Sequence, residues 1–574
     1  MPHYLAPNRR RFVQGLAAIG SAGCVPGAFA QASGGSVPEL HGSEFDLTLS
    51  EMPVNITGQR RIATVVNNSM PGPILRLREG DDVTFRVHNR LKETSSIHWH
   101  GLKLPNAMDG TPGLTFAGIP PDQTFTYRFP IIQGGTYWYH SHSGMQEQTG
   151  LFGSLIIQPQ KPDPFRYDRE YVVHLSDWTD KDPMMVVANL KQQSDYYNYH
   201  RRTLGTFIAD ARRNGLAATI DDRLMWGGMR MSPTDIMDVT GAVYTFLVNG
   251  LPPAANWTAA FRPGERIRLR FINSAAMTTF DVRIPGLSLT VVQADGSNVV
   301  PLEVEEFRIG VAETYDIIVQ PDDRAYTIFA QAQDRSGYAR ATLTARPGLA
   351  AEVPAMDPPP LRSMADMGMY HGGMDTSGHQ GHSMSSGDMA DMDMSSAAVN
   401  ATNVDPMKLR GQPFVDNVAM MPASRQDEAG TGLDGNGRKV LRYSQLKSME
   451  PAPYTLEPGR DIEFHLTGNM ERWTWGFDGK KFSEAPPIKV ALGETVRFVL
   501  VNDTMMEHPI HLHGFLFTVE NGQGDSQPLK HTVNVKPAEK VGIVFTADVP
   551  GHWAFHCHLM FHMDMGMFRT VIVS

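Results

Sequence analysis

Cysteine is almost absent from this chain, which has Cys24 and Cys557 as its two cysteines among 574 residues. A framework of several disulfides is therefore excluded. A basic excess is also missing, since 51 Lys and Arg stand against 61 Asp and Glu, and this disfavours nucleic-acid binding. After the N-terminal segment no apolar run approaches the ~18 residues of a membrane span. A Gly-rich phosphate loop and an ordered Ser-His-Asp arrangement are lacking too. The length and composition are those of a multidomain globular protein.

Residues 1–30 are typical of an export signal. Three arginines at 9–11 precede an apolar stretch at 15–23, and Ala-Phe-Ala at 28–30 fits a cleavage site. This order resembles a twin-arginine signal. It predicts export to the periplasm and a mature chain that starts near Gln31.

Three segments repeat one pattern, at residues 80–89, 264–273 and 493–502. Each starts with a Gly turn and an acidic residue, continues through alternating β-branched positions and ends at Asn, which is a strand signature. The spacings of 184 and 229 residues are too long for a solenoid. The repeat predicts three related β-sandwich domains.

The repeat places the domains at 40–160, 165–346 and 440–574. Residues 347–439 are rich in Pro, Gly, Ser, Asp and Met and poor in strand patterns, which predicts a linker that is largely flexible. Residues 182–240 mix helical and loop patterns and would form an insertion in the middle domain. The predicted fold is all-β with little helix.

Ten of the 21 histidines gather in four short motifs: His98-Trp99-His100, His140-Ser141-His142, His508-Pro509-Ile510-His511-Leu512-His513, and His556-Cys557-His558 with His562. In a strand, residues i and i+2 face the same side. Each His-x-His pair therefore presents two imidazoles to one place. Four pairs supply eight imidazoles, too many for one ion and suited to three coppers that share bridging oxygen species, since neutral imidazole is a good copper ligand.

The repeat predicts how these pairs correspond. His98 and His511 both lie nine residues after the repeat asparagine, and His100 and His513 both lie eleven after it. The other four correspond in the same way: His140 with His556 and His142 with His558. The eight imidazoles should meet between the first and third domains.

Cys557 lies between two of these histidines, so in a strand it faces the opposite side. Cys24 falls within the signal, and metal ligation would explain a single mature thiol in an oxidising compartment. His508 also faces away from His511, and His562 can return to the cysteine over a loop. Two His, a Cys thiolate and a weak axial Met form a blue-copper set, with Met567 as the axial candidate.

The other domains lack such a set. The equivalent positions of the first domain hold Ser95, Ser141, Gln146 and Leu151. The middle domain has Val282 and Ile284 where the paired histidines would stand. It should bind no copper and serve as a spacer.

The four motifs resemble those of multicopper oxidases, which include laccases, ascorbate oxidase, cuprous oxidases and copper-resistance oxidases. The resemblance covers nearly the whole mature chain and implies three cupredoxin domains of Greek-key topology and four copper ions. The implied reaction couples four one-electron oxidations of a substrate to the reduction of O2 to two waters. The implied ligands are His508, Cys557, His562 and Met567 for the type 1 copper, His98 and His511 for type 2, and His100, His140, His142, His513, His556 and His558 for the type 3 pair.

Three residues beside or within these motifs are candidates for catalysis. Cys557 would pass electrons to both neighbouring histidines. Asp109 resembles the proton donor of bacterial relatives, and a structural turn before Gly110 is an equal alternative. Glu507 would help to guide a substrate cation. Some bacterial cuprous oxidases have an acid directly after the last type 1 histidine, where this chain has Met563.

Methionine is abundant near the expected sites. Eight methionines lie between Met364 and Met394, together with His371, His379 and His382, and others are Met225, Met229, Met231, Met505, Met506, Met563 and Met565. Thioethers favour Cu(I), although core packing is the alternative for any single methionine. In these features the chain resembles the periplasmic copper-resistance oxidases.

The sequence therefore predicts oxidation of Cu(I) or a phenol by O2 in copper tolerance, with periplasmic copper-handling proteins as partners. A periplasmic copper-sequestering protein with secondary laccase-like activity is the alternative. A copper nitrite reductase is disfavoured, because such proteins use fewer domains and lack the full eight-histidine set.

Overall fold

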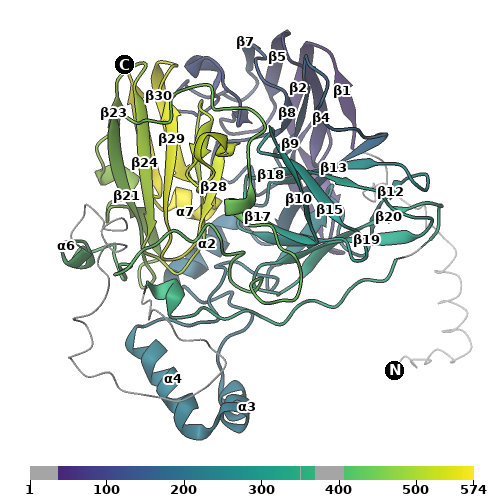
Figure 1. Ribbon diagram of the computed structural model, residues 1–574. Coiled ribbons are helices and arrows are strands. Elements are labelled where there is room, and N and C mark those ends of the chain that lie inside the picture. The colour runs from purple at the N-terminus through teal and green to yellow at the C-terminus, as the bar shows by residue number, and fades with distance from the viewer. Residues whose placement is uncertain (1–36, 350, 369–405) are drawn as a thin grey trace, which may run out of the picture.

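The three repeated segments form equivalent strands of three β-sandwiches (Figure 1). The computed structural model describes residues 37–349, 351–368 and 406–574. The repeats are β5 (Asp82–Asn89), β13 (Ile267–Asn273) and β24 (Thr495–Asn502). Apolar positions alternate with less buried ones in β5 and through most of β24, whereas all of β13 is buried. The predicted all-β fold is confirmed.

The asparagine that ends each repeat holds the next loop in the same way in all three domains. The side-chain amide of Asn89 donates to the carbonyls of Glu93 and Ile119 at 2.8 and 2.7 Å, and its oxygen accepts the N–H of the second residue on. Asn273 and Asn502 make the same three kinds of bond. All three are fully buried. Because a buried amide must be satisfied, asparagine fixes the loop that leads to the next strand.

The first domain has a four-stranded sheet, β3-β2-β5-β7, and a five-stranded sheet, β1-β4-β9-β8-β6. The strands besides β5 are β1 (Glu39–His41), β2 (Glu44–Asn55), β3 (Arg60–Val66), β4 (Gly72–Arg78), β6 (His98–His100), β7 (Thr124–Pro130), β8 (Gly135–His140) and β9 (Phe152–Gln158).

The second domain pairs a six-stranded sheet, β11-β10-β13-β18-β15-β16, with a five-stranded sheet, β12-β20-β19-β14-β17. Its other strands are β10 (Arg169–Thr179), β11 (Tyr244–Val248), β12 (Trp257–Ala260), β14 (Phe280–Arg283), β15 (Leu289–Ala294), β16 (Ser297–Val304), β17 (Glu306–Ile309), β18 (Thr314–Val319), β19 (Ala325–Ala332) and β20 (Tyr338–Thr344).

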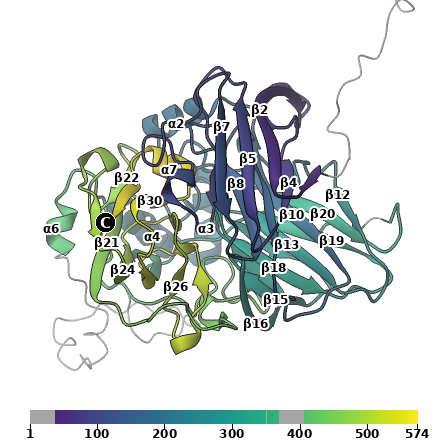
Figure 2. The same ribbon diagram turned by 90° about the horizontal axis from the view of Figure 1, so that it is seen from above.

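The third domain repeats this plan with β22-β21-β24-β29-β26-β27 and β23-β31-β30-β25-β28. Its other elements are β21 (Arg460–Asn469), β22 (Thr474–Phe477), β23 (Ile488–Val490), β25 (His508–Leu512), β26 (Phe517–Val519), β27 (Leu529–Lys530), β28 (Thr532–Val535), β29 (Lys540–Thr546), β30 (Gly551–Cys557), α7 (Met560–Asp564) and β31 (Phe568–Val573). Figure 2 shows this domain beside the first. Asn106 donates to the carbonyl of His552 at 2.7 Å across that interface.

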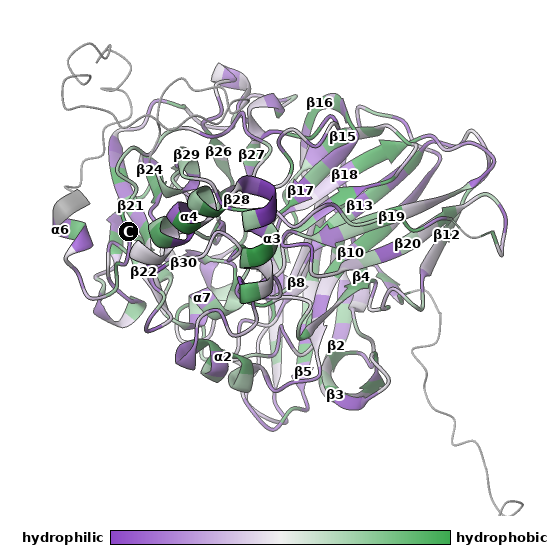
Figure 3. Cartoon of the chain, turned by 90° about the horizontal axis from the view of Figure 1, so that it is seen from below, coloured by the Kyte–Doolittle hydropathy of each residue, from purple (hydrophilic) through white to green (hydrophobic). Residues whose placement is uncertain are grey.

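Helices appear in the predicted insertion of the second domain. α2 (Pro183–Gln192) buries one face against the core, whereas α3 (Leu204–Asn214) and α4 (Leu216–Gly228) form a hairpin that projects from the body (Figure 1). Figure 3 shows apolar residues along this hairpin, and Leu204 and Leu224 are 76% and 68% exposed. Among the described residues, no helix combines the length and apolarity that a membrane crossing requires.

The described parts of the linker contact the second and third domains. Arg438 pairs with Glu306 of the second domain at 2.7 Å, and Arg425 donates to the carbonyl of Pro537 in the third domain at 2.6 Å. A short helix, α6 (Pro406–Arg410), begins the later part. The predicted export signal, Cys24 and the methionine-rich stretch from Met369 to Met394 lie outside the described residues.

Candidate metal centres

The histidine pairs occupy equivalent strands at the facing edges of the first and third domains. In the first domain, His98 of β6 pairs with His140 of β8. In the third, His511 of β25 pairs with His556 of β30. The two domains thus carry their histidines in the same register, which the repeat asparagine predicted.

The imidazoles of the two domains meet crosswise. Ring centroids lie 3.8 Å apart for His98 with His513 and for His100 with His511, 5.1 Å for His140 with His558 and 5.3 Å for His142 with His556. If each histidine is replaced by its equivalent in the other domain, the pair His98–His513 becomes His511–His100, and the pair His140–His558 becomes His556–His142. The cluster is therefore pseudo-symmetric about an axis between the domains.

The ligand nitrogens gather in groups that share some members, and each group is small enough for a single ion. Within each group they lie within 4.8 Å of one another, in the sets His98/His511/His513, His100/His140/His558 and His142/His513/His556. Metal–nitrogen bonds of ~2 Å suit such spacing. The sequence left the six type 3 candidates undivided, and the structure separates them into two sets of three.

The imidazole nitrogens that face the cluster have the chemistry of metal ligands. Nε2 of His98, His511 and His558 is buried without a hydrogen-bond partner among the described residues, although buried polar atoms are normally paired. Burial lowers the pKa of His142 to about 4 and that of His558 to about 3, so these rings are neutral and keep a free lone pair. The buried, neutral imidazoles of this cluster therefore have the chemistry that binding of copper ions requires.

Carboxylates hold the outer nitrogens of the cluster. Asp109 accepts a hydrogen bond from Nδ1 of His513 at 3.0 Å and another from the hydroxyl of Thr111 at 2.7 Å. Glu147, which sequence reasoning missed, lies 2.6 Å from Nδ1 of His140. Such partners orient the ring and make the imidazole a stronger ligand. Asp109 thus contacts the cluster and is more than a turn residue.

A second site lies on the other side of Cys557. Its Sγ is 3.5 Å from Nδ1 of His508 and 3.9 Å from Nδ1 of His562, and the two nitrogens are 3.3 Å apart. Burial raises the pKa of the thiol well above its ordinary value. A bound cation would displace that proton. Met567 is fully buried nearby, and its carbonyl accepts the N–H of Cys557 at 3.1 Å.

The outer nitrogens of this site also have partners. Nε2 of His508 is 2.7 Å from the hydroxyl of Thr504. Nε2 of His562 is 2.7 Å from Asp238, a residue of the middle-domain insertion. Trp475 stacks on His562 with ring centroids 3.8 Å apart. Asp238 was not among the predicted site residues, because it stands in a loop with no motif of its own.

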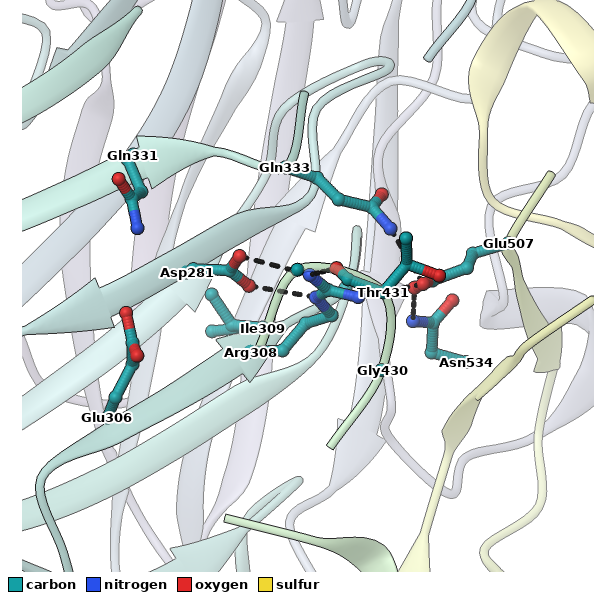
Figure 4. Close-up of polar contacts among 12 residues, drawn as sticks. Asp281, Glu306, Arg308, Ile309, Gln331, Gln333, Gly430, Thr431, Glu507 and Asn534 are labelled. Atoms are coloured by element: carbon teal, nitrogen blue, oxygen red, sulfur yellow. Dashed lines mark hydrogen bonds and ion pairs between the residues drawn. The ribbon is translucent and has the colours of Figure 1, made fainter. Parts of the chain in front are cut away.

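Glu507 lies in a buried polar network between the second and third domains (Figure 4). One oxygen accepts from Arg308 at 2.8 Å and from Gln333 at 2.6 Å, and the other accepts from Asn534 at 2.6 Å. Arg308 also donates two bonds to Asp281. Both carboxylate oxygens of Glu507 therefore accept hydrogen bonds from other side chains of the protein.

The structure joins three methionine-containing segments into one apolar cluster, and one of these segments leads into His508. Its buried core is Trp226, Met367 and Met505, with Met229, Met231 and Met364 partly buried against them. We name this group the methionine cluster. Met505 lies three residues before His508. The sequence had singled out these methionines without showing that they meet.

Comparisons with known proteins agree with this geometry. Sequence profiles of multicopper oxidases match residues 48–162, 169–347 and 455–574. Copper resistance protein A of Escherichia coli is 51% identical over 603 aligned positions, which cover 99% of this chain and 100% of that protein. The chain belongs to the multicopper oxidase family. It is accordingly a copper-binding oxidoreductase that reduces O2.

More distant relatives share the architecture. Multicopper oxidase MmcO of Mycobacterium tuberculosis (strain ATCC 25618 / H37Rv) is 31% identical, over 91% of this chain and 85% of its own length. Fet3p, a multicopper oxidase that functions in iron import, superposes with a TM-score of 0.64 at 19% identity, over 93% of this chain and 91% of its own. A laccase from Botrytis aclada gives 0.60 at 20% identity, over 93% and 88%. These structures show that the multicopper oxidase fold is shared.

Proposed function

We propose that this multicopper oxidase oxidises Cu(I) with O2 in the periplasm and so confers copper tolerance. The observation that carries the proposal is the methionine cluster, which brings soft thioethers next to the segment that holds His508. Thioethers prefer Cu(I) to harder cations. The similarity to copper resistance protein A and the twin-arginine pattern at residues 9–11 support the role and the compartment.

The proposed cofactors are four copper ions. The type 1 ligands would be His508, Cys557, His562 and Met567; the type 2 ligands His98 and His511; and the type 3 ligands His100, His140 and His558 for one ion and His142, His513 and His556 for the other. When bound, these ions would supply one-electron transfer and the reduction of O2 to water.

The chain's own residues orient this machinery. Cys557 is covalently linked to His556 and His558, so its backbone joins the two proposed sites. Asp109 orients His513 and would hold a proton at the oxygen side. Glu507 would act by positioning, because its bonds to Arg308 and Asn534 fix the segment that presents Met505 and His508.

Leucine substitutions in the methionine cluster test the substrate. Met364→Leu, Met367→Leu and Met505→Leu combined preserve volume and remove three thioethers. KM for Cu(I) should rise about tenfold, which corresponds to ~1.4 kcal/mol of binding, while kinetics with a small phenol stay unchanged. Met52→Leu with Met70→Leu, in a separate apolar cluster between the first and second domains, is the matched control. Equal changes for both substrates would contradict Cu(I) as the preferred substrate.

Sequestration of copper with secondary phenol oxidation is the second candidate, and the eight methionines between Met364 and Met394 favour it. Two variants separate the candidates in cells. Deleting residues 369–394 should preserve much of the tolerance if oxidation protects, and Cys557→Ser should abolish it. Full protection by Cys557→Ser together with loss on deletion would establish sequestration instead.

A further inference from the structure

The turn between β15 and β16 brings a carboxylate of the middle domain close to the histidine cluster. Asp295 and Gly296 form this turn, both with positive φ, and Asp295 is fully buried. On one side Gly296 packs so closely on the first domain that a Cβ there would come within 2.3 Å of the Tyr137 ring. On the other side Asp295 contacts residues 530–532 of the third domain. The turn therefore lies where all three domains meet.

Asp295 accepts hydrogen bonds from two successive backbone amides at the junction of β27 and β28. Its Oδ2 accepts the N–H of His531 at 3.2 Å and that of Thr532 at 3.1 Å. Nζ of Lys530, which is also fully buried, lies 3.2 Å from the same oxygen. Oδ1 accepts the N–H of Thr314 in the middle domain at 3.0 Å. Because buried amides require a partner, this carboxylate fixes the backbone of the junction.

The same junction carries the hydrogen-bond acceptor for His511. Nδ1 of His511 donates to the carbonyl of His531 at 2.6 Å, so the lone pair of the ring is on Nε2. His98, the other proposed type 2 ligand, is held in the same way, because its Nδ1 donates to the carbonyl of Asp109 at 2.8 Å. Nε2 of both rings is buried without a hydrogen-bond partner among the described residues. Each carbonyl thus selects the tautomer that leaves Nε2 free for a metal ion.

One planar peptide group, which we name the linking peptide, connects Asp295 to His511. The carbonyl of His531 and the N–H of Thr532 belong to this peptide, and in a trans peptide the two point in opposite directions. Asp295 binds the N–H, and His511 binds the carbonyl. A negative charge at the N–H polarises the peptide and makes its carbonyl a stronger acceptor. The carboxylate therefore acts on the imidazole as a directly bonded carboxylate acts on a metal-ligating histidine.

We infer that Asp295 of the middle domain is a positioning residue for His511 of this multicopper oxidase. Through the linking peptide it fixes the direction of Nε2 and makes the imidazole a stronger copper ligand. The inference rests on the proposed ligand set, in which His511 binds the type 2 copper, and it is the same for Cu(I) and for a phenol as substrate. The middle domain then does more than serve as the spacer that the sequence predicted.

Two substitutions of Asp295 test this inference on the copper-loaded full chain. Asp295→Asn tolerates the left-handed turn and removes the charge, whereas Asp295→Ala removes both acceptor oxygens. Competition with a chelator should show an affinity for the type 2 copper that is about tenfold lower in Asp295→Asn and up to about a hundredfold lower in Asp295→Ala. The hyperfine coupling of the type 2 electron paramagnetic resonance signal should change in both variants. The type 1 signal should stay unchanged.

Hydrogen exchange of the copper-free protein tests the first step of the inference without a metal. The backbone amides of His531 and Thr532 should exchange faster in both Asp295 variants than in the unaltered protein, because they lose a buried acceptor or its charge. Mass spectrometry of peptides that span β27 and β28 measures the rates.

The matched control is Glu313→Gln. Glu313 is the other carboxylate beside the buried Lys530, at 3.0 Å, but it accepts hydrogen bonds from Gly310 and Tyr443 instead of from the linking peptide. Glu313→Gln should therefore lower the unfolding temperature, as Asp295→Asn does, and keep the type 2 signal and affinity of the unaltered protein.

An unchanged type 2 affinity and hyperfine coupling in both Asp295 variants would overturn the inference and leave the proposed function standing. Equal changes in Glu313→Gln, or unchanged exchange of the two amides, would overturn it as well. Asp295→Asn decides by itself if Asp295→Ala fails to fold. An unaltered protein with no type 2 signal would overturn the proposed ligand set together with this inference.

Discussion

Asp238 and His562 are joined by a 2.7 Å hydrogen bond although they lie 324 positions apart in the chain. The carboxylate comes from the middle-domain insertion, and the histidine is a proposed type 1 ligand of the third domain. The other oxygen of Asp238 accepts the indole N–H of Trp473 at 2.9 Å. The domain that carries no histidine pair thus orients a ligand of the proposed type 1 site.

Asp238→Asn should lower stability and raise the reduction potential of the type 1 copper. An amide has one acceptor oxygen for two buried donors, and an unpaired donor costs about 1–3 kcal/mol. Loss of the negative charge also makes the imidazole a weaker donor to copper. Thermal unfolding and a spectroelectrochemical titration measure the two effects. Asp564→Asn, exposed on α7, is the control, and an unchanged potential in Asp238→Asn would argue against this role.

Asp109→Asn should slow turnover about 10–100-fold, the usual effect of losing a partner behind a metal ligand. The loss should be equal for Cu(I) and a phenol, because Asp109 contacts His513 at the oxygen cluster and no residue of the methionine cluster is among its hydrogen-bond partners. Steady-state kinetics with both substrates measure it. Asp122→Asn, an exposed turn residue, should have normal activity. A selective loss with one substrate would contradict the assignment.

Glu507→Gln should destabilise the protein more than it affects Cu(I) binding. The amide offers one acceptor oxygen where Glu507 meets three buried donors, so at least one loses its partner, at about 1–3 kcal/mol. Differential scanning calorimetry and KM for Cu(I) report the two properties. Glu471→Gln breaks an exposed ion pair with Arg230, and such pairs contribute little. A large rise in KM without loss of stability would show instead that the carboxylate binds Cu(I).

His465 should make stability fall at alkaline pH. Burial alone would lower its pKa, but hydrogen bonds with Asp503 at 2.6 Å and Glu463 at 3.3 Å outweigh burial and raise the pKa to about 9. The pKa of this histidine in the unfolded chain is ~6.5. The stabilisation that protonated His465 gives the folded protein is therefore complete below pH ~6.5 and is lost as the pH rises through about 9.

The unfolding temperature measured from pH 6 to 10 checks this prediction. It should fall more steeply for the unaltered protein than for His465→Gln, which has no titrating ring at this position. His552→Gln, at an exposed histidine, should follow the unaltered protein. Parallel curves for the unaltered protein and His465→Gln would contradict the assignment.

Local periodicity was sufficient to predict the fold and the grouping of the histidines. Alternation of side chains in a strand is a property of the backbone, so His98 with His100 and Cys557 opposite its neighbours could be read directly from the order of residues. The repeat asparagines supplied the register, because each satisfies the same buried bonds in its own domain.

Other features depended on how the domains pack. The meeting of His98 with His513, and of Met229 with Met367 and Met505, requires segments from different domains or insertions to be brought together. No local pattern encodes such distances. The environment of Glu507 could not be predicted from the sequence either, because its hydrogen-bond donors, Arg308, Gln333 and Asn534, belong to other segments of the chain.

Residue order was enough to predict three β-sandwiches, two of them with paired histidines, and to place Cys557 among the candidate copper ligands. These follow from residue order, because strand alternation and the repeat act over short distances. The support of His562 by Asp238 and of His140 by Glu147 became apparent from the folded arrangement. Asp238 and His562 lie 324 positions apart, and Glu147 contacts His140 from the irregular segment that follows β8, so strand alternation and the repeat predict neither contact. Both contacts are buried, and because water is excluded there the protein itself must supply the polar partners.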